Sequence, residues 1–264
     1  MYFQLLLILY HGHKRFSYQT VFLYLCLVWS ALRTTLFSFF FKDTVLANQL
    51  SFIPYWMLFC FPSFLQYAIM TLLLVFFSQL VVPAHLRDPD ELDRRRRRIF
   101  ALAGVGIFVF LTTNLVCAIL TKYLYLTDLF LSVKRANIVL ARVTINDGLF
   151  MTCAICLSVI IVKLTKRPSA RVAFEAKDIG VPGAIALAVI ICIIFISRGV
   201  YNFMAVLFKI CPSFGYGWIN VSDQADLSNL SDEMAYFSFG LVLLLWECLP
   251  TTMIVMFFRC EKQR

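Results

Sequence analysis

Five ionisable side chains lie inside long apolar stretches of this 264-residue sequence, and their types could support chemistry there. They are Arg33, Arg142, Asp147, Arg198 and Glu247. The two carboxylates could in principle exchange a proton as an acid pair, but no nucleophile or intramembrane-protease motif accompanies them. A charged group is costly in hydrocarbon, so each of the five is expected to face protein or water. We expect these residues, with Asn202, to form one intramembrane polar cluster.

Two interpretations of the intramembrane polar cluster stay open. Its three cations and two anions could neutralise one another as ion pairs that fix the order of the helices, or they could line a hydrated cavity for a ligand or ion. We expect Glu247 to pair with Arg33 or Arg198. Pro250 follows Glu247 and is expected to bend its helix, because proline removes a backbone donor. Three amides can add hydrogen bonds: Asn114, Asn146 and Asn202.

Sequence motifs for catalysis, cofactors and metals are missing. The sequence has no GxSxG, no HExxH and no phosphate-binding glycine loop. The three histidines have no metal-ligand partner, and no Cys/His spacing suggests zinc. We therefore predict that the protein is not an enzyme and binds no cofactor or metal.

The elements that must position the polar cluster are transmembrane helices. Hydrophobic residues make up 61% of the chain and charged residues only 15%, too few to cover a water-facing surface. The apolar runs reach the length of about 20 residues that spans a bilayer. We predict one all-α membrane bundle over residues 1–264, of seven-span design with a truncated first helix. The predicted spans are residues 1–10 (partial), 18–41, 53–82, 99–121, 136–162, 181–208 and 235–258.

Lysine and arginine predict how the chain is threaded. Sixteen of them lie in one set of alternate loops and the tail, and five lie in the other set. Cytoplasmic loops carry the excess, so the amino terminus is expected in the lumen and the carboxyl terminus in the cytosol. Two N-glycosylation sequons, at Asn220 and Asn229, lie in the loop predicted to be luminal. The net charge of +9 thus follows from membrane orientation, and we expect no nucleic-acid partner.

One basic run stands at the predicted cytosolic start of the span at 99–121. It consists of Arg94, Arg95, Arg96, Arg97 and Arg98. Such a run is typical of a topology anchor, since cations near the bilayer attract anionic headgroups. A second interpretation is a basic patch for a specific lipid or a partner protein.

Several segments of the sequence resemble one family. They are HGHKRFSYQTVFLYLCLVWSALRTTLFSFFFKD at 11–43, ARVTINDGLF at 141–150, SRGVYN at 197–202, WINVSDQADL at 218–227 and WECLPTTMIVMFFR at 246–259. These segments are similar to the G-protein-coupled receptor 137-like proteins, lysosomal seven-transmembrane orphan proteins. Three features depart from that family: the truncated first span, the arginine run, and a tail of six residues after Phe258.

The resemblance implies a lysosomal multi-pass protein that promotes TOR complex 1 signalling by engaging Rag GTPases. Two alternatives stay open: an orphan G-protein-coupled receptor, and a small-molecule or ion transporter. The receptor alternative is weakened because the third span ends in FFSQLVVP and the last in LPTTMIVMFFR, without the motifs of rhodopsin-like receptors. The transporter alternative rests on the intramembrane charges and mid-span prolines alone.

Overall fold

A computed structural model describes residues 18–40, 46, 49–81, 89–126, 132–166, 181–208, 241 and 244–257. Within these ranges the regular elements are helices, which confirms the predicted all-α membrane bundle. In chain order they are α2 (Tyr18–Phe40), α4 (Phe52–Phe59), α5 (Phe61–Val81), α6 (Pro89–Leu126), α7 (Ser132–Thr165), α9 (Val181–Phe208), the π-helical turn η2 (Leu244–Cys248) and α12 (Leu249–Phe257).

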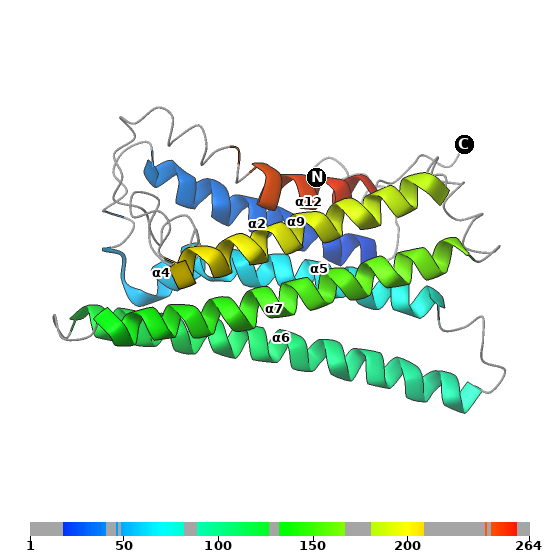
Figure 1. The fold of residues 1–264 in the computed structure, drawn as a ribbon, viewed down its shortest axis with the longest axis horizontal. Coiled ribbons are helices and arrows are strands. Elements are labelled where there is room, and N and C mark those ends of the chain that lie inside the picture. Colours follow the sequence, from blue (N-terminus) through cyan, green and yellow to red (C-terminus); the bar gives the residue numbers. More distant parts are fainter. Residues whose placement is uncertain are drawn as a thin grey trace.

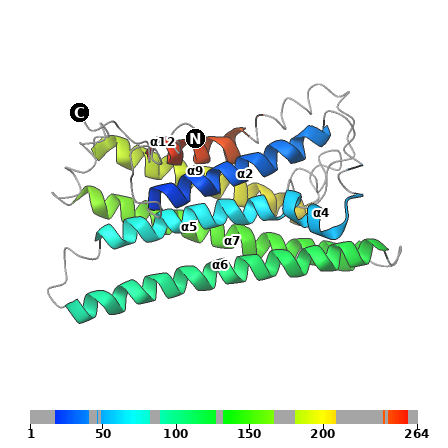
Figure 2. The same ribbon diagram turned by 180° about the vertical axis from the view of Figure 1, so that it is seen from behind.

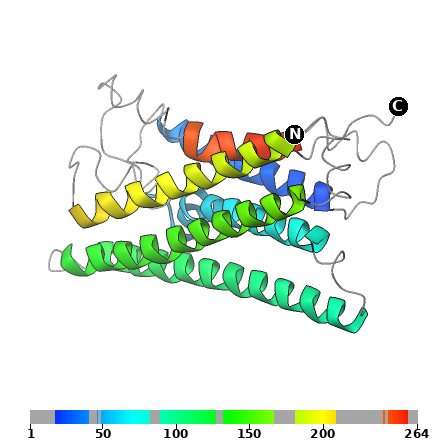
Figure 3. The same ribbon diagram turned by 45° about the vertical axis from the view of Figure 1, so that its right-hand side comes forward.

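Successive long helices alternate in direction, as a chain threaded back and forth across a membrane must. In Figure 1, α2, α6 and α9 run one way, while α5 and α7 return. Helix α5 packs against α2, α6 and α7, and α7 also packs against α6 and α9, so these two helices form the centre of the bundle. Figures 2 and 3 show α6 at its outer edge. Five described helices are long and apolar enough to span a bilayer.

A ladder of aromatic rings joins four helices at the core. The ring of Tyr67 on α5 stacks on Phe110 of α6, with centroids 4.6 Å apart. Phe150 of α7 meets Phe110 edge-on at 5.5 Å and stacks on Phe195 of α9 at 5.4 Å. Gly106 gives this ladder room, because a Cβ there would lie 2.8 Å from the Tyr67 hydroxyl. Offset and edge-to-face rings add packing energy beyond the area that they bury.

The predicted span 53–82 is two helices rather than one. Helix α4 ends at Phe59, α5 begins at Phe61, and Cys60 lies between them. Pro62 has no N–H, so the carbonyl of Leu58 receives no bond from it, and the helix breaks here. The backbone bond from Phe64 N to Cys60 O, at 3.3 Å, restarts the helical ladder in α5.

The other helix bounds differ from the predicted spans mainly at polar ends. Helix α6 begins ten residues before the predicted span 99–121, because the polar segment from Pro89 to Arg98 continues the helix outward. Asp90 and Glu91 in its first turn stabilise that start through the helix dipole. Helix α7 likewise extends the predicted span 136–162 at both ends. The predicted span 235–258 is described only in part, and residues 1–10 lie outside the described residues.

Candidate functional site

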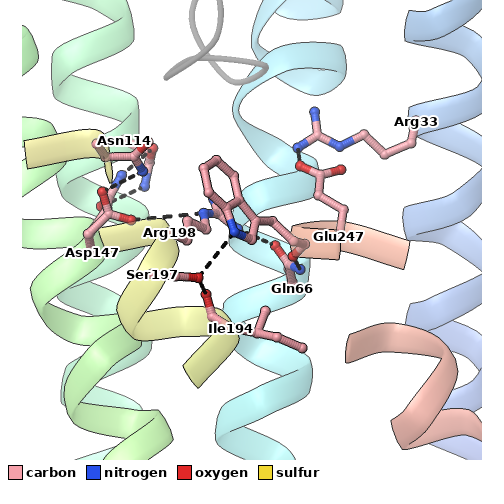
Figure 4. A network of polar contacts seen from close by, with 11 residues as sticks. Arg33, Gln66, Asn114, Asp147, Ile194, Ser197, Arg198 and Glu247 are labelled. Carbon is pink, nitrogen blue, oxygen red and sulfur yellow. Dashed lines mark hydrogen bonds and ion pairs between the residues drawn. The ribbon is translucent and has the colours of Figure 1, made fainter. Parts of the chain in front are cut away.

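An ion pair joins the first described long helix, α2, to the π-helical turn η2 near the other end of the chain. Arg33 Nη2 of α2 lies 2.5 Å from Glu247 Oε1 of η2, and both side chains are buried. Of the two partners expected for Glu247, the structure brings it to Arg33. Figure 4 shows the pair on one side of the polar contacts described below. We call the whole set of contacts the polar layer.

The π-helical turn and Pro250 give Glu247 its position. A π turn inserts one extra residue into the helical repeat and so rotates the residues that follow relative to those before it. Glu247 lies in η2 and is 6% exposed, while its neighbour Cys248 is exposed. Thr251 Oγ1 donates to the Glu247 carbonyl at 2.8 Å. Next to Pro250 the structure has a π turn followed by α12, while the bend expected there stays a prediction.

Trp246 links the irregular segment to two other helices. Its carbonyl accepts a hydrogen bond from Gln66 Nε2 of α5 at 3.3 Å. In an α-helix that carbonyl would accept from residue 250, but Pro250 has no N–H to donate. The indole Nε1 of Trp246 donates to Ser197 Oγ of α9 at 3.3 Å (Figure 4).

Arg198 on α9 lies at the centre of the polar layer. Its Nη1 donates to Gln66 Oε1 at 2.9 Å, and its Nε lies 4.0 Å from Asp147 Oδ1 of α7. The guanidinium also lies over the Phe150 ring, 5.0 Å from the centroid, in a cation–π contact. Gln66 thus binds Trp246 with its nitrogen and Arg198 with its oxygen, and it joins three helical segments.

Asp147 completes this side of the layer. Its Oδ2 accepts a hydrogen bond from Asn202 Nδ2 of α9 at 2.8 Å, and both residues are 4% exposed. Helices α7 and α9 approach closely here. The close approach is seen at Gly199 on α9, where a Cβ would lie only 2.8 Å from Met151 Sδ of α7. The lack of a side chain at Gly199 permits this close approach, and Asp147 contacts both Arg198 and Asn202 across the same pair of helices.

A reciprocal amide pair joins α6 to α7. Asn114 Nδ2 donates to Asn146 Oδ1 at 3.2 Å, and Asn146 Nδ2 donates to Asn114 Oδ1 at 3.1 Å. Asn114 also donates to the carbonyl of Phe110 at 2.8 Å. Amides paired in this way satisfy polar groups that lipid cannot.

Arg142 is the remaining member of the predicted cluster. It lies on α7, is 2% exposed and stands beside the thiol of Cys60 at the break between α4 and α5. Asp147 lies five residues after Arg142 on α7, and its carboxylate interacts electrostatically with both Arg198 and Arg142. The five charged residues of the predicted cluster, of which Arg198 is half-buried and the others are buried, thus carry three positive charges and two negative ones when ionised.

The arrangement of the polar layer favours a structural role. Each carboxylate has a cationic neighbour, and the amides bridge between helices. The described residues contain no group of three His, Cys, Asp or Glu that could hold a metal ion. The basic run, Arg94 to Arg98, lies away from the layer at the start of α6, and all five side chains are exposed. Asn220 and Asn229 lie outside the described residues.

Sequence reasoning missed three members of the layer: Gln66, Ser197 and Trp246. Gln66 was detectable as an amide in the middle of an apolar stretch, where polar side chains usually bond between helices. The carbonyl of Trp246 was detectable from the spacing to Pro250. Only the fold shows that these two signals belong together.

Comparison with known proteins identifies the family. The family model for the GPR137 N-terminal domain matches residues 1–220. The chain belongs to the GPR137 family. It is 44% identical to human integral membrane protein GPR137B over 259 residues, which cover 97% of this chain and 63% of that protein.

Other family members show similar identity. The chain is 41% identical to G protein-coupled receptor 137Ba of Danio rerio over 268 residues, covering 99% of this chain and 69% of that protein. It is 40% identical to human integral membrane protein GPR137, covering 99% and 62%. The chain thus spans about two thirds of the length of these relatives. No solved structure matches it. The family and the bundle together establish a multi-pass integral membrane protein.

Proposed function

We propose that this chain is a non-enzymatic regulator of nutrient signalling at the lysosomal membrane, which promotes TOR complex 1 activity by recruiting Rag GTPases. Membership of the GPR137 family carries the proposal, because the resemblance of the sequence to that family implies this role. The polar layer supports it, because its side chains bond to one another between helices as a scaffold requires.

The charges at the helix ends favour one end of the bundle as the partner-binding face. The starts of α2, α6 and α9 lie at the same end as the ends of α5 and α7 (Figure 1). Exposed cations gather there: Arg94, Arg95, Arg96, Arg97, Arg98, Lys163 and Lys166. By the positive-inside rule this end faces the cytosol, where Rag GTPases are found. Glycans at Asn220 and Asn229 would then be luminal.

Capture of Rag GTPases tests the proposal. The full chain, tagged and expressed in cells, should colocalise with lysosomal markers and enrich Rag GTPases over an unrelated lysosomal membrane protein. Lys163→Gln with Lys166→Gln should reduce that enrichment. Lys134→Gln with Arg135→Gln removes the same charge at the opposite end of α7 and should leave it unchanged. Enrichment no greater than that of the unrelated protein contradicts the proposal.

A receptor coupled to G proteins is the second candidate, and the observation that favours it is that the Danio rerio relative is named G protein-coupled receptor 137Ba. Agonist-dependent nucleotide exchange on a G protein, in membranes containing this chain, would favour it over the scaffold. A transporter is the third. Its test is flux into proteoliposomes that Glu247→Gln abolishes.

A further inference from the structure

One face of α6 carries arginines at its start and exposed apolar side chains further along. At 100° per residue, Arg94 and Arg98 fall on the same side of the helix as Leu102, Val105 and Phe108. These three apolar side chains are 74%, 60% and 67% exposed. The opposite side holds the buried Phe110 and Asn114. The face of Arg94, Arg98, Leu102, Val105 and Phe108, which we call the outer stripe, therefore points away from the bundle.

The length of the outer stripe matches one leaflet. Ten residues separate Arg98 from Phe108, which is about 15 Å along a helix, or half of a hydrocarbon core roughly 30 Å thick. Arg98 then lies at the level of the lipid phosphates when Phe108 lies near the midplane. A phospholipid beside the stripe would place its acyl chains on the apolar residues and its phosphate at the arginines.

The arginines on this side keep donors for a ligand. Arg94 Nε donates to the Asp90 carbonyl at 3.4 Å, and this bond does not use the terminal guanidinium nitrogens. Guanidinium groups bind phosphate and carboxylate through paired hydrogen bonds. Arg95 differs, because it forms an ion pair with Glu91 at 3.1 Å.

The charges along this helix follow an order that distinguishes headgroups. Moving outward from the apolar stripe, Arg98 and Arg94 come first, and Asp90 and Glu91 follow one turn farther out on the same side. Glu91 Oε1 is 3.1 Å from Arg95 Nη2, so an ammonium group would bind the second oxygen of that carboxylate. A headgroup that fits this order has its phosphate beside Arg98, nearer the hydrocarbon, and its ammonium group beside Asp90 and Glu91, farther from it. It also carries a second anionic group within reach of Arg94. Phosphatidylserine has this order. A polyphosphorylated inositol ring would instead place its outer phosphates against the two carboxylates.

We propose that a phosphatidylserine molecule lies along the outer stripe of α6, its phosphate and carboxylate bound by Arg98 and Arg94 and its acyl chains on Leu102, Val105 and Phe108. The leaflet is the cytosolic one in the threading of the proposed function, on which this detail rests. Binding itself does not depend on Rag GTPases, so the two proposals fail separately.

Equilibrium binding of a phosphatidylserine with a fluorescent acyl chain to the purified full chain in mixed micelles tests the site. Arg94→Gln with Arg98→Gln should weaken binding by about tenfold or more, from roughly 1 kcal/mol per cation. Arg96→Gln removes one charge from the opposite side of the helix, about 160° around from Arg98, and should weaken binding by less than Arg98→Gln alone. Equal losses in Arg96→Gln and Arg98→Gln would overturn the site. Circular dichroism and melting of each variant establish that it is folded.

A lipid of equal charge tests the headgroup. Phosphatidylglycerol also carries one negative charge but has no ammonium group, and it should bind several-fold more weakly than phosphatidylserine. Asp90→Asn with Glu91→Gln should remove that difference. Equal binding of the two lipids by the unmodified chain, or tighter binding of a phosphatidylinositol bisphosphate, would overturn the assignment to phosphatidylserine.

Discussion

The side-chain amide of Gln66 donates to the main-chain carbonyl of Trp246, the carbonyl that Pro250 leaves without its α-helical donor. A side chain on α5 thus supplies a hydrogen bond that the last described segment cannot make for itself. The same amide accepts from Arg198, so the irregular backbone of η2 is coupled to the ion pair between α9 and α7.

Replacing Gln66 should therefore cost more than one hydrogen bond. We expect Gln66→Leu to lower the free energy of unfolding by about 1–3 kcal/mol, since it leaves buried polar groups without partners. The measurement is thermal unfolding of the purified chain in detergent. Pro250→Ala restores an N–H four residues after Trp246, so the cost of Gln66→Leu should shrink in that background. Equal costs in both backgrounds would mean that Gln66 does not replace the bond that Pro250 removes.

The pair of Arg33 and Glu247 should behave as a unit. Arg33→Glu or Glu247→Arg alone places two like charges together inside the bundle, and each should lower stability by about 3–5 kcal/mol, the range for breaking a buried pair. The charge swap that combines both should recover much of the loss. Yield of folded protein and melting temperature report the result. A swap no more stable than either single variant would show that the pairing does not hold the helices.

The exposed pair of Arg95 and Glu91 on α6 is the matched control. It has the same chemistry but side chains that are 53% and 47% exposed. Exposed pairs of this kind contribute about 0–1 kcal/mol. Exchanging these two charges should therefore change the melting temperature far less than Arg33→Glu or Glu247→Arg does, even though it places an arginine in the first turn of α6.

The sequence predicts the membrane spans, and it predicts that the buried carboxylates pair with arginines. It does not predict where the helical backbone becomes irregular. Long apolar runs must be helical in lipid, so α2 and α9 match their predicted ranges almost to the residue. The pairing of Glu247 was limited to two arginines because few charges share the membrane interior. Which arginine it binds depends on how the η2 turn rotates its side chain, and a π turn has no sequence signal of its own.

The break at Cys60 shows the same limit. Pro62 marks a place where a helix can be interrupted. In many membrane helices, however, a proline only kinks the helix, which continues past it. Here α4 and α5 are separate helices, and Arg142 from α7 lies beside Cys60 at the break. Pro62 predicts an interruption from the local sequence, but the contact of Arg142 with the break joins residues far apart in the chain, and no local pattern predicts it.

The reciprocal bonds between Asn114 and Asn146 predict non-additive mutations. Asn114→Leu or Asn146→Leu alone removes one member of the pair, leaves polar atoms of the other without that partner, and should cost about 1–3 kcal/mol. The double variant removes both polar groups and should cost less than the sum of the two. Melting temperatures of the four proteins give the coupling. Strict additivity would mean that the two amides do not depend on each other.

The close contact between Gly106 and Tyr67 predicts that a substitution at Gly106 destabilises the protein. It also predicts that a second substitution, at Tyr67, reduces that loss of stability. The ring of Tyr67 is held between Phe110 and Phe150, so its hydroxyl cannot easily move from a Cβ placed 2.8 Å away. We expect Gly106→Ala to lower stability by about 1–3 kcal/mol through overpacking. Gly104→Ala on the same helix has nothing within 4 Å and should be neutral or slightly stabilising, since alanine favours helix. Tyr67→Phe removes the hydroxyl, which leaves the ring carbon Cζ at 3.8 Å, an ordinary contact. Gly106→Ala should therefore cost less in that background, and an undiminished cost would place the strain elsewhere than at this contact.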